Sequence, residues 1–205
     1  MSIRRRLLLM AQQGGGLPAA YQAVEWINGA DCDIDLLYVP TVNPKVISKF
    51  AITATSDRDV MGFTQNSVPS FIVDCYLRGN IPSMTTSWYN RFYSTFVYSF
   101  GFQFTSYDDP HVFEFGETVK VDGITLTTTS NGDWSANTKS FHVFAGRSRH
   151  LGVKLYSFAL YDGGILARDL IPCYKKSDAV IGVYDKISKA FYTSTHGSFT
   201  KGQDI

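Results

Sequence analysis

The sequence carries little charge. Charged residues make up 18% of its 205 residues, and the formal net charge is +1. Nucleic-acid-binding domains usually present a strongly basic face, so this composition gives no sign of nucleic acid as a partner. Long apolar runs are also missing. No stretch approaches the roughly 18 apolar residues that cross a bilayer, so we expect no membrane span and no membrane partner.

Cysteine and the common catalytic motifs are equally scarce. The three cysteines (Cys32, Cys75 and Cys173) are odd in number and widely spaced. They predict buried thiols rather than a disulfide framework or a metal site. The four histidines show no His-x-His or i, i+4 pair suited to zinc. The chain has no Gly-x-Ser-x-Gly elbow, P-loop or dinucleotide fingerprint, so we expect no cofactor and no enzymatic activity.

One pair of acidic residues bears on whether the chain is a glycoside hydrolase. Glycoside hydrolysis needs two carboxylates on one face. The nearest run is Glu114-Phe-Gly-Glu117, whose spacing of three places the two acids on opposite sides of a strand, and no third acid follows. A glycoside hydrolase with unusual acids is therefore a minor alternative, which a reducing-sugar assay would test.

What the chain does contain is typical of β-structure. Aromatic residues reach 15%, with abundant Thr, Ser and Val. Short alternating segments are separated by turn residues, and no amphipathic helix follows the N-terminal segment. We expect the longest strand at 91–105, and a hairpin at Asp122-Gly123 between strands at 112–121 and 124–129. The pattern predicts an antiparallel β-sandwich or jelly roll.

The clearest signal is the run KLYSFALYDGG at residues 154–164. It alternates apolar and polar residues, reverses at Asp-Gly-Gly, and restarts as ILARDLIP at 165–172. The glycines suit the positive φ angles of a tight reversal, and we expect Pro172 to end the second strand. Arg168 and Asp169 predict a salt-bridged corner, with Asp178 or Asp185 as a further partner.

This ending carries a family resemblance. Residues 155–185 (LYSFALYDGGILARDLIPCYKKSDAVIGVYD) resemble the C-terminal half of concanavalin A-like, LamG-type β-sandwich modules of bacteriophage virion and prophage proteins. Residues 189–202 (KAFYTSTHGSFTKG) are similar to their closing segment, and 17–27 (LPAAYQAVEWI) to their opening strand. The resemblance implies a jelly-roll sandwich spanning 17–205. Its terminal motif identifies a fold rather than a site, because each piece has a structural task.

The chain departs from that pattern at residues 29–35 (GADCDID). In an extended segment Asp31, Asp33 and Asp35 share one face. Three carboxylates could provide oxygen ligands for Ca²⁺. The competing interpretation, which we favour, is a solvated strand face, so we expect no firm metal site.

Residues 1–16 form a separate N-terminal segment that ends in Gly14-Gly15-Gly16. Its apolar run is too short for the core of a signal peptide, and no A-x-A cleavage site follows. One interpretation is a frayed terminus. The other is an arm that anchors the protein on a partner, because a cluster of apolar residues is costly to leave in water. The residues of this candidate anchor are Arg4, Arg5, Arg6, Leu7, Leu8 and Leu9.

A second set of candidates concerns glycan binding. Exposed aromatic rings can stack on sugars, with amide and carboxylate groups supplying hydrogen bonds. The segment Asn131-Gly-Asp-Trp134 is the most attractive, because a turn can present the indole beside polar groups. The alternatives are core positions for each aromatic and, around Trp88, a protein interface. The candidate ligand-binding residues are Trp134, Asn131, Asp133, Asn137, Trp88 and Tyr89.

Two functions follow as expectations. The resemblance implies a non-enzymatic structural protein on the surface of a bacteriophage particle: a capsid decoration, head fibre or tail component. Its partners would be other virion proteins held through the arm, host-surface glycans, and further copies of the chain. The alternative is a carbohydrate-binding adhesion module of a phage or bacterium that is not a stable part of the particle. The arm favours the first.

Overall fold

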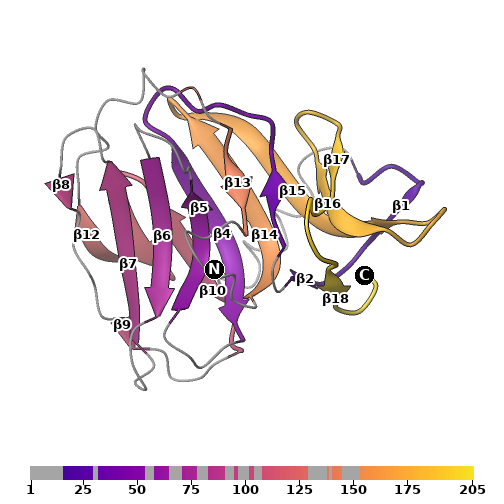
Figure 1. The fold of residues 1–205 in the computed structure, drawn as a ribbon, viewed down its shortest axis with the longest axis horizontal. Helices are drawn as coiled ribbons and strands as arrows, with labels where there is room; N and C mark the ends of the chain where they lie inside the picture. Colours follow the sequence, from indigo (N-terminus) through magenta and orange to yellow (C-terminus); the bar gives the residue numbers. More distant parts are fainter. Residues whose placement is uncertain are drawn as a thin grey trace, which may run out of the picture.

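The computed structural model describes residues 16–29, 32–53, 58–64, 71–77, 83–90, 95–96, 102–103, 108–128, 138, 140–144 and 153–205. Within these ranges the regular structure is entirely β-strand, which confirms the predicted all-β class (Figure 1). No helix in the described part of the chain is long and apolar enough to cross a membrane.

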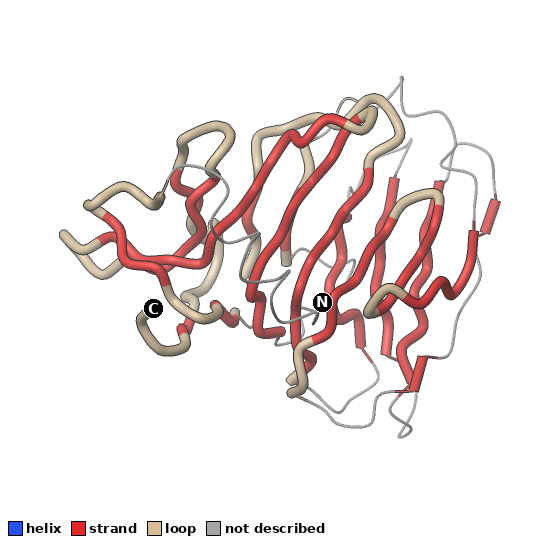
Figure 2. The backbone as a smooth tube through the Cα atoms, turned by 180° about the vertical axis from the view of Figure 1, so that it is seen from behind, coloured by secondary structure: helices blue, strands red, loops and turns tan. Residues whose placement is uncertain are grey.

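The largest sheet among the described residues has 11 antiparallel strands. Its main path runs β12-β11-β10-β4-β14-β15-β16-β17, with β1 on β15 and with β2 joining β14 to β18. Figure 2 shows this sheet from behind, with no described strand in front of its central part. Its strands are β1 (Tyr21–Ala23), β2 (Ile27–Asn28), β4 (Lys45–Ile52), β10 (His111–Phe115), β11 (Thr118–Val121), β12 (Ile124–Thr128), β14 (Val153–Asp162), β15 (Ile165–Lys175), β16 (Ile181–Asp185), β17 (Phe191–Tyr192) and β18 (Thr200–Lys201).

Two smaller sheets accompany it. In Figure 1 β6 and β7 are drawn in front of β10 and β12, and β13 lies close to β5. The five-stranded sheet contains β5 (Arg58–Thr64), β6 (Phe71–Leu77), β7 (Ser83–Asn90), β8 (Thr95–Phe96) and β9 (Phe102–Gln103). The third sheet is the antiparallel pair β3 (Ile34–Asp35) and β13 (His142–Val143).

The core lies against one face of the large sheet. Along β4 the buried positions Val46, Ser48 and Phe50 alternate with half-buried ones, as a sheet with one covered face requires. Phe50 stacks on Phe113 of β10 with 4.0 Å between ring centroids. Burial of such side chains is the main stabilising contribution in a fold of this kind.

A bulge in β14 fits the same core. Leu155 and Phe158 are both buried although their spacing of three breaks the period of two. The register against β4 shifts between Leu155 and Ser157, which returns Phe158 to the covered face. At the bulge the Ser157 carbonyl accepts the hydroxyl of buried Ser48 at 3.0 Å. The bulge therefore satisfies the one polar side chain that β4 buries.

Both predicted hairpins are confirmed. Asp122 and Gly123 have φ of 51° and 83°, and Gly163 and Gly164 have φ of 56° and 81°. Positive φ at both central residues is typical of the type I′ turns that match the twist of two-residue hairpins. These turns join β11 to β12 and β14 to β15.

Other expected strand bounds were wrong. The strand expected at 112–121 is two strands that meet at Gly116 and Glu117. Pro172 does not end its strand, because β15 continues to Lys175. Its carbonyl accepts the Val24 N–H at 3.0 Å. Pro172 has no backbone N–H to donate. It lies between the part of β15 that pairs with β14, which ends at Leu170, and the part that pairs with β1, which begins at Cys173.

Two further segments also differ. The strand expected at 21–27 is interrupted between β1 and β2, and among the described residues 32–39 only Ile34–Asp35 forms a strand. Of the long strand expected at 91–105, the described residues are β8 and β9, which both pair antiparallel with β7. The rest of that range lies outside the described residues, so its continuity stays a prediction.

Candidate functional site

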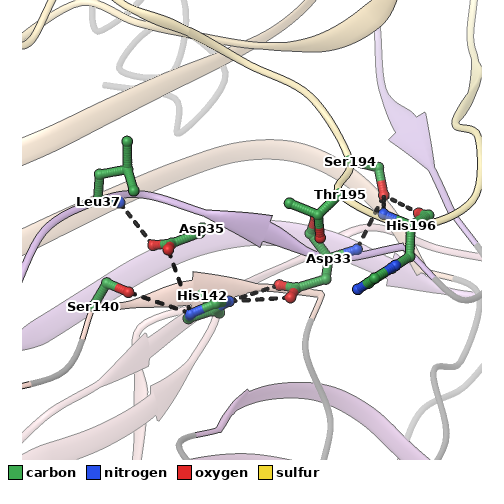
Figure 3. Close-up of polar contacts among 8 residues, drawn as sticks. All are labelled: Asp33, Asp35, Leu37, Ser140, His142, Ser194, Thr195 and His196. Atoms are coloured by element: carbon green, nitrogen blue, oxygen red, sulfur yellow. Dashed lines mark hydrogen bonds and ion pairs between the residues drawn. The ribbon is translucent and has the colours of Figure 1, made fainter.

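A cluster of polar side chains centres on His142 (Figure 3). The β3–β13 ladder places His142 opposite Asp35, and Asp33 lies two residues earlier on the same side. His142 Nδ1 is 2.9 and 3.1 Å from the two carboxylate oxygens of Asp33. Its Nε2 is 3.3 Å from Ser140 Oγ and 3.8 Å from Asp35 Oδ2. Two carboxylates therefore face the two ring nitrogens of one imidazole.

The electrostatics favour a charged imidazole. The hydrogen bond that the His142 ring donates to the Asp33 carboxylate raises the pKa of His142 above its ordinary value of 6.5, and the charges of Asp33 and Asp35 act in the same direction. Partial burial opposes them. Since an imidazolium donates from both nitrogens, it can serve both carboxylates at once.

Ser140, His142 and Asp33 contact one another in the order found in a serine–histidine–aspartate catalytic triad. A serine nucleophile needs a neutral imidazole that accepts its proton on Nε2. Here a second carboxylate, from Asp35, lies beside Nε2 and stabilises a proton there. This arrangement suits an ion pair between segments better than a general base.

A third segment is tied to this cluster. Ser194 Oγ accepts the Asp33 N–H at 3.2 Å, and the Asp33 carbonyl accepts the Thr195 N–H at 2.9 Å. Ser194 Oγ also donates to the carbonyl of His196 and accepts its N–H. The connection between β17 and β18 is thus fastened to the residue that binds His142.

Replacing His142 by glutamine is expected to lower the free energy of unfolding by about 1 kcal/mol, because the charge-assisted bond to Asp33 is lost. A histidine whose folded pKa is raised contributes fully below its unfolded pKa of 6.5. The contribution disappears as pH rises through the folded value. Urea unfolding at several pH values should therefore show the wild-type advantage only at the acidic end.

Asp33→Asn is the matched control for this pH dependence. It keeps a side chain of the same shape but removes the first cause of the raised pKa. The pH dependence should shrink in this variant. An advantage of wild type over His142→Gln that grew with pH would contradict the assignment.

A second polar cluster surrounds Asp162 at the start of the β14–β15 turn. Its Oδ1 accepts the Val42 N–H at 2.7 Å, and its Oδ2 accepts the Thr41 N–H and the Tyr38 hydroxyl, each at 3.0 Å. The Tyr38 pKa is raised, first by desolvation and then by this hydrogen bond. Arg168 lies over the Tyr38 ring at 4.6 Å. These contacts fix the segment 36–44 against the turn.

The third cluster surrounds Asp185, which is fully buried. Its carboxylate accepts the backbone N–H groups of Asp169 at 2.9 Å, Ile187 at 3.0 Å and Ser188 at 3.2 Å. Arg168 Nε lies 3.4 Å from its Oδ2. The predicted salt-bridged corner is confirmed for Arg168, with Asp185 as the partner, whereas the Asp169 carboxylate pairs with Lys186. Asp178 instead accepts the Val180 N–H in an exposed turn.

Two of the three weak Ca²⁺ candidates face a histidine rather than forming the solvated strand face that we favoured. Asp33 and Asp35 bind His142, while Asp31 lies outside the described residues. No group of three or more His, Cys, Asp or Glu suited to a metal ion occurs in the part of the chain that the structure describes. Sequence reasoning missed His142 because its contact to Asp33 joins positions 109 residues apart.

The other candidates are placed only in part. Trp88 and Tyr89 lie in β7, in register with Val73 and Ile72 of β6. The buried thiols are confirmed for Cys32 and Cys173, and burial raises the pKa of Cys173 to about 12. Two sets of candidates lie outside the described residues: the glycan candidates Asn131, Asp133, Trp134 and Asn137, and the anchor residues Arg4, Arg5, Arg6, Leu7, Leu8 and Leu9.

No model of a known protein family matches the chain, and no curated protein is detectably similar to it.

Proposed function

We propose that this chain is a non-enzymatic structural protein of a bacteriophage particle: a capsid decoration, head fibre or tail component. In this proposal residues 17–205 form a concanavalin A-like jelly-roll sandwich displayed at the particle surface, and residues 1–16 anchor it to other virion proteins. The resemblance of residues 155–185 and 189–202 to phage modules supplies the family.

One observation carries the non-enzymatic part. Each acidic cluster described above binds backbone N–H groups or a basic side chain. Asp162 holds Thr41 and Val42, Asp185 holds Arg168 and three N–H groups, and Asp33 holds His142. Carboxylates with this much hydrogen bonding hold loops in place. They are poorly suited to exchanging protons with a substrate.

The test uses the phage that encodes the chain. Deleting residues 1–16 should abolish incorporation into particles while the remaining protein stays folded and soluble in the host. Arg4–Arg6 replaced by Ser, with the leucines kept, separates charge from apolar anchoring. Unchanged incorporation of the deletion variant would defeat the anchor.

One observation favours the alternative, a carbohydrate-binding adhesion module. The rings of Tyr156, Tyr161 and Trp26 are half-buried, and each lies beneath a lysine, with 4.9–5.2 Å between the lysine Nζ and the ring centroid. Aromatic rings flanked by donors are typical of sugar platforms. A glycan array with Tyr156→Ala and Trp134→Ala controls tests this alternative. Absence of binding to any glycan on the array would contradict it for the sugars sampled.

A further inference from the structure

We draw no further inference here: the strongest candidate, the surface patch on β4 and β14 where Lys45 lies over Tyr161 and Lys49 over Tyr156, belongs to the glycan-binding alternative already described, and nothing in the structure shows what covers it.

Discussion

Replacing Asp185 by alanine is expected to lower the free energy of unfolding by about 3–5 kcal/mol, enough to unfold a marginally stable domain. The carboxylate is fully buried and accepts three backbone N–H groups. Its removal leaves these donors and the Arg168 guanidinium without their acceptor in the interior. Urea unfolding followed by circular dichroism measures the change.

Two control variants locate the cause. Asp185→Asn keeps an acceptor oxygen but loses the charge, so it should fall between wild type and Asp185→Ala. Asp178→Ala removes a carboxylate that accepts one N–H in an exposed turn, and it should cost less than about 1 kcal/mol. Equal stability of Asp185→Ala and Asp178→Ala would contradict the buried role.

Replacing Gly182 by alanine should cost about 3 kcal/mol, for a purely steric reason. A Cβ at this position would lie 2.1 Å from the Tyr192 carbonyl oxygen and 2.8 Å from the Phe191 ring. Both neighbours belong to β17, which pairs with β16. The strand would have to move away, and the backbone oxygen cannot rotate aside as a side chain can.

Gly116→Ala is the matched control, since its nearest neighbours are the flexible side-chain atoms of Lys45 at 3.1 and 3.3 Å. It should cost less than about 1 kcal/mol by the same urea measurement. A loss at Gly182 no larger than at Gly116 would show that β17 gives way freely, and the close approach of the two strands would then be unimportant.

The two hairpins could be predicted because their signals are local. Asp122-Gly123 and Gly163-Gly164 fix their reversals through φ angles that few other residues adopt, and alternation along 154–164 fixes which side chains are buried. For Arg168 the sequence left Asp178 and Asp185 open as partners, and the structure selects Asp185. Even here Pro172 misled, because a proline can stay in a strand where the neighbouring strand changes.

The candidate site was harder to predict. His142 and Asp33 meet only because β3 and β13 pair, and nothing in either short segment specifies the other. The spacing of Asp31, Asp33 and Asp35 suggested a Ca²⁺ site, because the sequence shows that they share a strand face. It does not show that His142 lies beside Asp33 and Asp35.

The most direct measurement of the central claim is a quantitative protein inventory of purified phage particles by mass spectrometry. The account predicts that this chain is present in multiple copies per particle and stays with the particles through high-salt washing. A chain found only in the host-cell fraction, and absent from washed particles, would contradict a structural role in the virion.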